Sequence, residues 1–262
     1  MLIYSVARCL VLFYWLYLKV LPLYSYIKKQ LKLAVACLML PCCVAAGEAF
    51  VFAAEDSWPP FAKADGTGLS RSIIEQALAY SGSTATFITV PYARALKMAE
   101  NGQVDGAYNV TRQQNTLKRF VFGSEPLFQA RASFYYPKDS TFNYASVDKF
   151  PGGLNIALIT GYEYGDTFEA HRKRFKEVRL ANQRQIINML LENKVHMAIM
   201  FDEVAAYTLA AMQLPEDAIR KGELNHVSDI YVAFSPEANN LQSKLAVFDE
   251  GLRQVKQESN IR

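Results

Sequence analysis

Most of this chain lacks cysteine. All four cysteines of the 262-residue sequence lie within the first 43 residues: Cys9, Cys37, Cys42 and Cys43. From residue 47 onward there is consequently no disulfide, no zinc-thiolate site and no cysteine nucleophile. The three histidines are scattered, with no pair at metal-ligand spacing: His171, His196 and His226. We therefore predict no metal site, no cofactor and no catalytic residue.

The N-terminal part of the chain lacks acidic residues. Residues 1–46 contain no aspartate or glutamate, although they hold five of the 28 basic residues. All 25 acidic residues come later, so the net charge changes from +3 for the whole chain to about −2 for residues 47–262. The basic charge of the whole chain therefore gives no reason to expect nucleic acid as a partner.

Residues 28–47 have the organisation of a secretory signal. The basic cluster Lys28-Lys29-Gln30-Leu31-Lys32 precedes an apolar run at residues 33–44, and small residues follow at Ala45-Ala46-Gly47. The apolar run is shorter than the roughly 20 residues that span a bilayer. We predict cleavage after Ala46 and export to the periplasm.

The segment before this signal, residues 1–27, is apolar and aromatic but is interrupted by Arg8 and Lys19. Two interpretations remain open. The start site is placed too early, so that the segment is never made, or the segment is a membrane anchor. We favour the first, because the two basic residues shorten the uninterrupted apolar run to about ten residues.

After the leader, strand-like and helix-like segments alternate. We predict strands at residues 50–54, 84–90 and 104–110, a helix behind Ser72, and a helix from Tyr92 that ends at Gly102. This βαβαβ order predicts a parallel sheet with helices on its faces.

The second half repeats the alternation, with strands and helices at residues 154–160, 186–191, 195–201 and 203–212. Two further strands, at residues 132–136 and 230–234, connect the halves. We predict one lobe from residues 47–137 and 232–262, a second lobe from residues 138–231, and a ligand cleft between them.

Six segments in this order resemble the family 3 periplasmic solute-binding proteins, the amino-acid-binding components of ABC transporters: Asp56–Phe61, Pro91–Leu96, Asn101–Gly106, Val121–Leu127, Gly161–Asp166 and Ala198–Asp202. The resemblance covers nearly all of residues 48–258. It implies an α/β, two-lobed, type II periplasmic binding fold, in which each lobe is a mixed, mostly parallel sheet flanked by helices and two hinge strands join the lobes.

The resemblance also implies a function. A monomer in the periplasm would capture an amino acid or a related polar metabolite by hinge closure and deliver it to an ABC transporter permease, without enzymatic activity. Two alternatives remain. The chain is an enzyme on the same scaffold, similar to cyclohexadienyl dehydratases, with Asp202 or Glu55 as the acid, or it is a ligand-sensing partner of a membrane receptor.

The chain departs from the family at the carboxylate clamp. Members commonly hold the α-carboxylate of the ligand with the arginine of a threonine-x-glutamate-arginine motif. Here Thr111 is followed by Arg112-Gln113-Gln114-Asn115, with no arginine at the matching place. Arg94 and Arg112 are the available substitutes. The alternative for Arg94 is a charge on the helix surface, and the alternative for Arg112 is a side chain that points outward from its own helix.

Other ligand contacts are predicted either from the family resemblance or from the chemistry of the residues themselves. Asp202 would hold the amino group of a ligand, or would cap a helix instead. Tyr162 and Tyr164 flank backbone N–H groups at a helix start. Aromatic residues near the first strand would form apolar walls, or lobe core. The complete set of predicted ligand contacts is Asp56, Trp58, Phe61, Tyr92, Arg94, Asn109, Thr111, Arg112, Tyr162, Tyr164 and Asp202.

Overall fold

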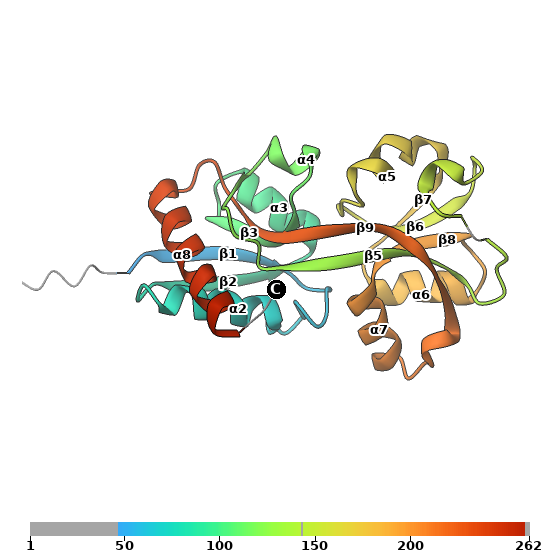
Figure 1. Cartoon of the computed structure of the whole chain (residues 1–262), viewed down its shortest axis with the longest axis horizontal. Helices are drawn as coiled ribbons and strands as arrows, with labels where there is room; N and C mark the ends of the chain where they lie inside the picture. The colour runs from blue at the N-terminus through green and yellow to red at the C-terminus, as the bar shows by residue number, and fades with distance from the viewer. Residues whose placement is uncertain (1–46, 143, 260–262) are drawn as a thin grey trace, which may run out of the picture. The chain divides into compact units, whose positions relative to one another are not determined.

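The computed structural model describes residues 47–142 and 144–259, which form two lobes around a continuous sheet (Figure 1). The strand order is β2-β1-β3-β9-β5-β8-β6-β7, and β4 pairs with β9. The predicted leader, its cleavage site after Ala46 and the segment 1–27 lie outside the described residues. In the part of the chain that is described, no helix has the length and apolar character needed to cross a membrane.

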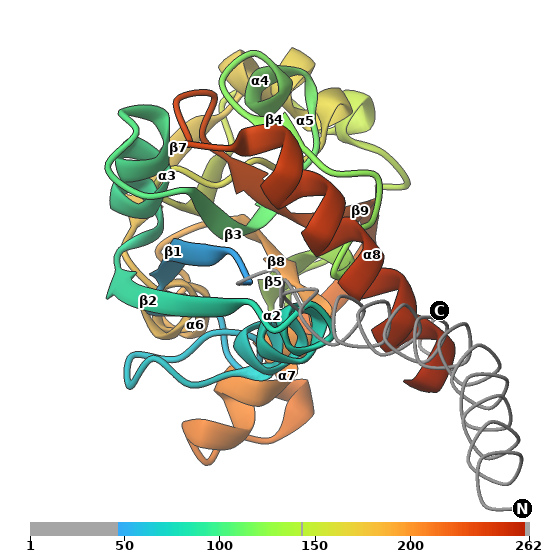
Figure 2. The ribbon, with the colours of Figure 1, turned by 90° about the vertical axis from the view of Figure 1, so that its left-hand side faces the viewer.

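The first lobe contains three parallel strands with helices around them. Its elements are β1 (Ala49–Glu55), α2 (Leu69–Ala79), β2 (Thr84–Val90), α3 (Tyr92–Glu100), β3 (Gly106–Thr111), α4 (Gln114–Leu117), β4 (Val121–Phe122) and α8 (Leu241–Ser259). The last helix, α8, packs against α2 (Figure 1 and Figure 2). A Cβ on Gly251 of α8 would lie 2.0 Å from the carbonyl oxygen of Ala77, so this close packing requires glycine.

The second lobe repeats the arrangement of the first. Its elements are β6 (Asn155–Ile159), α5 (Asp166–His171), β7 (Lys176–Leu180), α6 (Gln183–Leu191), β8 (Met197–Phe201) and α7 (Asp202–Ala211), with short 3-10 turns at Val147–Lys149, Arg172–Arg174 and Glu216–Ala218. The order β7-β6-β8 matches β2-β1-β3, and β6 is parallel to both of its neighbours.

Two long antiparallel strands, β5 (Phe128–Pro137) and β9 (Ile219–Phe234), run through both lobes (Figure 1). The end of β9 pairs with β3 of the first lobe, whereas Ala132–Tyr135 of β5 pair with β8 of the second. The predicted pair of hinge strands is thus present. The predicted lobe limits, 137/138 and 231/232, remain a prediction, and these ladders favour a crossing nearer Phe128–Arg131.

Aromatic side chains fill both lobes. Phe52 on the central strand β1 is fully buried, and its ring centroid lies 5.9 Å from Phe234 and 6.1 Å from Phe248. In the second lobe, the rings of Phe134 and Phe150 lie 4.9 Å apart. Fully burying one such side chain contributes about 1.5–3 kcal/mol, and the buried apolar residues of both lobes form one continuous cluster.

The structure contains more regular structure than the sequence predicts. The strand predicted at residues 230–234 begins eleven residues earlier, at Ile219, and the strand predicted at residues 132–136 spans Phe128–Pro137. Strand β7 and helix α8 are not among the predicted elements. Residues 219–229 of β9 and all of β7 are mostly polar and partly exposed. Each of these stretches pairs with a single neighbouring strand, so part of it remains in contact with solvent. The predicted strand at residues 84–90 coincides with β2.

Candidate functional site

A small buried cavity lies where the two lobes meet. It is lined by Glu55, Trp58, Tyr92, Asn109, Thr111, Tyr162, Glu163 and Phe201. Most of these residues end, or directly follow, the parallel strands β1, β3, β6 and β8, and ligands of open α/β sheets bind at such carboxyl ends. The cavity volume is about 10 Å³, which is room for about one water molecule. The two lobes are therefore closed on each other.

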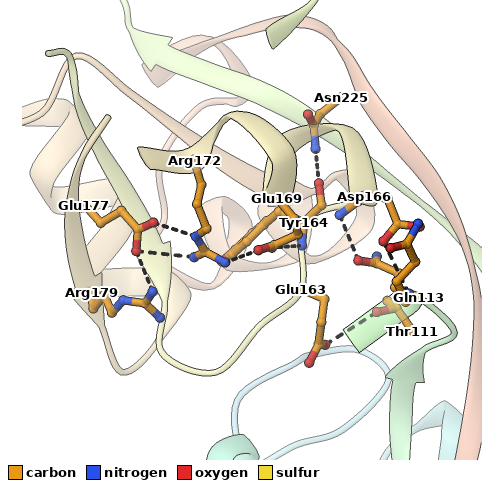
Figure 3. Close-up of polar contacts among 12 residues, drawn as sticks. Thr111, Gln113, Glu163, Tyr164, Asp166, Glu169, Arg172, Glu177, Arg179 and Asn225 are labelled. Atoms are coloured by element: carbon orange, nitrogen blue, oxygen red, sulfur yellow. Dashed lines mark hydrogen bonds and ion pairs between the residues drawn. The ribbon is translucent and has the colours of Figure 1, made fainter. Parts of the chain in front are cut away.

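Two tyrosine–glutamate hydrogen bonds cross between the lobes inside this cavity. The hydroxyl of Tyr162 in the second lobe donates to Oε2 of Glu55 in the first. In the opposite direction, the hydroxyl of Tyr92 in the first lobe donates to Oε2 of Glu163 in the second, at 2.9 Å. Thr111 adds a longer contact of 3.4 Å to the same Glu163 oxygen (Figure 3). Each lobe thus supplies one carboxyl group and one tyrosine hydroxyl to the other.

Burial governs the charge of both carboxyl groups. Glu55 is 1% exposed and Glu163 is 5% exposed. Loss of water raises the pKa of Glu55 to about 8, although the hydrogen bond from Tyr162 opposes this shift. Loss of water likewise raises the pKa of Glu163 to about 7, against the hydrogen bond from Tyr92 and the positive charge of Arg119. Both carboxyl groups therefore change between the protonated and the ionised form near neutral pH.

The two tyrosines remain protonated. Burial and the neighbouring carboxyl groups raise the pKa of both phenols, Tyr92 and Tyr162, well above the ordinary value. Their rings also touch across the lobes, with centroids 4.8 Å apart in an edge-to-face arrangement. The hydroxyls are thus available only as neutral hydrogen-bonding groups.

Local backbone geometry places the residues of the second lobe. The loop between β6 and α5 holds Tyr162 and Glu163 between Gly161 and Gly165, whose φ angles are +88° and +87°. These left-handed conformations favour glycine. A Cβ on Gly161 would also lie 3.0 Å from the Cβ of Ala93, so glycine lets this loop approach the first lobe.

The first lobe fixes its residues by a turn and a bulge. Two backbone hydrogen bonds between Trp58 and Ala62 close a tight turn that holds the indole in place. Asn109 has a φ of +64° at a shift of register between β3 and β9. Such a bulge redirects side chains, and asparagine tolerates the left-handed conformation better than most residues.

One polar donor of the cavity lacks a partner. Within residues 47–142 and 144–259, Nε1 of Trp58 has no hydrogen-bond acceptor, although Trp58 is 1% exposed. The side chain of Asn109, which accepts from the hydroxyl of Ser70, is directed at Glu55 and lowers the pKa of that carboxyl group. A buried donor without an acceptor is costly, so Nε1 of Trp58 marks a position for a water or a ligand acceptor.

A polar seam extends the contact between the lobes beyond the cavity (Figure 3). The backbone N–H of Gly165 donates to Oε1 of Gln113 at 3.2 Å, and that of Gln114 donates to Oδ1 of Asp166 at 3.3 Å. On the far side of this loop, Arg172 is ion-paired within the second lobe. The first two contacts must break when the lobes separate.

Five predicted ligand contacts line the cavity: Trp58, Tyr92, Asn109, Thr111 and Tyr162. Three others lie nearby but outside it. The Tyr164 hydroxyl accepts from the backbone N–H of Ile159 at 2.6 Å, within the second lobe. The ring of Phe61 stacks on Phe128 at 4.3 Å, and Asp56 lines a separate, wider cavity of about 390 Å³.

The two predicted arginines do not line the cavity. Arg94 is exposed on α3, and Arg112 is exposed with its guanidinium 5.7 Å from the ring centroid of Tyr231. Asp202, the first residue of α7, already has partners in its own lobe. It accepts hydrogen bonds from Lys221 at 2.7 Å, Tyr135 at 3.0 Å and Ser133 at 3.2 Å. Their roles as ligand contacts remain predictions that these positions do not favour.

Three lining residues are absent from the predicted set. Phe201 packs edge-on against Trp58 at 5.0 Å, while Glu55 and Glu163 carry the charge of the site. From the sequence, Glu55 is named only as a candidate acid of the enzymatic alternative. One signal was available, because a carboxyl residue that directly ends an apolar strand lies at the ligand-binding edge of a parallel sheet. Across the described residues, no cluster of three metal-ligating side chains occurs.

Comparisons with known proteins identify the fold. No family model and no curated protein matches the chain. Among solved structures, a histidine kinase sensor domain with similarity to periplasmic binding proteins has a TM-score of 0.68 at 15% identity, covering 82% of this chain and 93% of that chain. An arginine third transport system periplasmic binding protein from Legionella pneumophila has a TM-score of 0.67 at 14% identity, over 82% and 96%.

A third solved structure is an ancestral amino acid-binding protein described as a precursor of cyclohexadienyl dehydratase. Its TM-score is 0.65 at 14% identity, over 81% of this chain and 91% of that chain. At such low identity, these likenesses establish the architecture and leave the ligand open. Together with the parallel strands of each lobe and the two strands that cross between the lobes, they show that the chain has the two-lobed type II periplasmic binding fold, as its sequence resemblance implied.

Proposed function

We propose that the protein is a solute-binding protein that captures a small polar ligand between its lobes by hinge closure. The observation that carries the proposal is the reciprocal pair of bonds from Tyr162 to Glu55 and from Tyr92 to Glu163. Each bond joins the two lobes at the carboxyl ends of their strands, where this architecture binds ligands. Polar groups that converge in a buried pocket are typical of a small-molecule site.

The hinge would lie in the two crossing strands. Between the part of β9 that pairs with β3 and the part of β5 that pairs with β8, the two strands pair only with each other, over Gln129–Arg131 and Val227–Asp229. Few contacts resist bending there. The open form would admit the ligand, and contacts to the second lobe would then favour the closed form.

Export and delivery belong to the same proposal. The leader-like residues 28–47 support export to the periplasm. The resemblance to transport-system binding proteins supports delivery to an ABC transporter permease by a monomer, with no catalytic step. The structural likeness to the Legionella pneumophila protein, which is described as part of a transport system, is consistent with this role.

A thermal-shift and calorimetric screen tests the proposal. Residues 47–262, which fall within one compact unit, would be screened against amino acids, amines, small carboxylates and short peptides. Ligand at about a hundred times Kd should stabilise the protein by roughly 2.7 kcal/mol. Small-angle scattering should show that ligand changes the distance between the lobes. If no polar solute in the screen produces either effect, the proposal is wrong.

One observation favours an enzymatic function as a second candidate. Glu55 and Glu163 have pKa values of about 8 and about 7, in the range that suits general acid–base catalysis at neutral pH. The structural likeness to a precursor of cyclohexadienyl dehydratase gives the assay, which is turnover of prephenate or arogenate. Turnover that disappears in Glu55→Gln or Glu163→Gln would establish catalysis, whereas binding without turnover would leave the solute-binding proposal in place.

A further inference from the structure

The cavity holds two carboxyl groups and, in its described lining, no basic side chain that would compensate their charge when they ionise. Glu55 and Glu163 are its two ionisable acids, and among the described lining residues there is no lysine, arginine or histidine. Arg119 lies outside the lining, and its positive charge lowers the pKa of Glu163. Its guanidinium group is already ion-paired with Glu100. Burying charge of one sign is unfavourable unless the opposite charge is supplied. A bound cation would supply it.

The remaining walls also favour a cation. The rings of Tyr92, Tyr162, Trp58 and Phe201 surround the two carboxyl groups. Aromatic faces attract ammonium and guanidinium groups through their quadrupoles, most strongly where water is excluded. The same faces give no stabilisation to a carboxylate.

One buried donor accommodates the neutral part of the ligand. Nε1 of Trp58 lacks an acceptor among the described residues, whereas the side chain of Asn109 is directed at Glu55 and lowers the pKa of that carboxyl group. A hydroxyl or carbonyl oxygen on the ligand would satisfy the indole N–H. A carboxylate would satisfy it as well, but it would bring a further negative charge beside Glu55 and Glu163. Neutral N–H donors do not compensate a buried charge in the way a guanidinium does.

We propose that the ligand is a small organic cation that carries a neutral oxygen acceptor or none, and no carboxylate group. Glu55 and Glu163 hold the cationic nitrogen, and the aromatic rings of both lobes enclose it. This inference rests on the proposed solute-binding function. It differs from the expectation of an amino acid, because the residues that would neutralise an α-carboxylate, Arg94 and Arg112, are exposed and outside the lining.

Matched ligand pairs test the inference by calorimetry on residues 47–262 at about pH 8. Ethanolamine and glycine share an ammonium group on two carbons, and they differ in a hydroxyl against a carboxylate. Agmatine and arginine share a guanidinium chain and differ only in the carboxylate. At least one amine should bind, and it should bind at least about tenfold more tightly than its acid.

The possible outcomes separate this inference from the proposed function. Glycine or arginine binding as tightly as its amine overturns the cation assignment and still supports solute binding. Tight binding of a neutral or anionic solute from the wider screen has the same meaning. Failure of every solute overturns the solute-binding function and the cation assignment together.

Charge-removing variants give a second test. Glu55→Gln and Glu163→Gln keep an oxygen that accepts from the partner tyrosine but remove the negative charge, so each should weaken amine binding by at least about tenfold. Glu192→Gln is the matched control, since Glu192 is exposed and pairs with Lys194 on the surface. Circular dichroism and Tm would show that each variant is folded. Equal amine affinity in the wild type and both cavity variants overturns the inference.

The pH dependence of amine affinity separates ligand binding by Glu55 and Glu163 from a purely structural role of these residues. Amine affinity should rise between about pH 6 and pH 8 as Glu55 and Glu163 ionise. Glu55 faces Tyr162, Asn109, Asp56 and Glu163, and Glu163 faces Tyr92, Thr111, Arg119 and Glu169. Ethanolamine keeps its charge over this range. An affinity that falls or stays constant over this range overturns the assignment.

Discussion

Raising the pH should open the ligand-free protein. In the closed form, burial holds the pKa of Glu55 at about 8 and that of Glu163 at about 7, against an ordinary value of 4.5. Separation of the lobes would return water to both carboxyl groups and lower both pKa values. The closed form therefore binds more protons than the open form. It is favoured at low pH and loses that advantage as the pH rises through 7 and then 8.

The magnitude follows from the two shifts. Each unit of pH below a raised pKa, and above the pKa of the solvated group, is worth about 1.4 kcal/mol per carboxyl group. Between pH 6 and pH 7 both groups contribute, and between pH 7 and pH 8 only Glu55 does. The closed form should lose up to about 4 kcal/mol between pH 6 and pH 9, roughly a thousandfold change in the ratio of closed to open forms.

The protein contains its own reporter of this change. The sequence has two tryptophans, Trp15 and Trp58, and only Trp58 lies within residues 47–262. Its indole is 1% exposed beside Glu55 in the closed cavity. Opening should shift its fluorescence to longer wavelength and raise the radius of gyration in small-angle scattering. If both signals are constant from pH 6 to pH 9, ionisation of these carboxyl groups does not control closure. In Glu55→Gln, only the transition near pH 7 should remain.

Three substitutions separate closure, binding and stability. Gly161→Ala should favour the open form without unfolding the lobes, because the new Cβ would lie 3.0 Å from the Cβ of Ala93 and residue 161 has a left-handed φ. Small-angle scattering at pH 6 should show a larger radius of gyration than for the wild type. An unchanged radius of gyration would contradict the close approach of the two lobes at this position. Arg94→Ala should leave ligand affinity within about twofold, since the side chain is exposed; a larger loss by calorimetry would restore it as a ligand contact. Asp202→Asn should lower stability by about 1–2 kcal/mol, measured by urea unfolding, at unchanged affinity, because the hydrogen-bond partners of Asp202 lie in its own lobe.

The architecture follows from the sequence wherever a strand carries a strong local signal. The β-branched run at residues 84–90 becomes β2 with the predicted ends. The alternation of strands and helices predicts both lobes and the two connecting strands, although β7 of the second lobe is not among the predicted strands. Residues 219–229 were missed since their ladder to β5 leaves side chains in solvent, where polar residues conceal a strand.

The positions of the two arginines follow from the direction in which neighbouring side chains point. Tyr92 and Arg94 are two positions apart on α3, about 200° around a helix, so they face nearly opposite directions. Thr111 and Arg112 are adjacent at the end of a strand, where successive side chains alternate between faces. Since Tyr92 and Thr111 line the cavity, both arginines point away from it. Their exposure was therefore implied once the cavity-facing residues were chosen.

The carboxyl residues could not be assigned from the sequence because their role depends on the other lobe. Glu55 and Tyr162 are 107 positions apart, and Glu163 and Tyr92 are 71 apart. Neither pairing leaves a local pattern. A glutamate at a strand end or in a glycine loop is usually solvated, and only the approach of the second lobe removes its water.

The two tyrosine bonds have a further consequence for affinity. The closed cavity has room for about one water molecule, so a larger ligand enters only the open form, and its apparent affinity is reduced by the fraction of protein that is open. Tyr162→Phe removes the donor that holds Glu55 while keeping the ring, and should weaken the closed, empty form by about 1 kcal/mol. At pH 6, where closure is strongest, this variant should bind a cation about fivefold more tightly than the wild type. Glu55→Gln should bind it less tightly, because this change removes the negative charge while it keeps an oxygen that accepts from Tyr162. Calorimetry that shows weaker binding in Tyr162→Phe would mean that the hydroxyl contacts the ligand and does not compete with it.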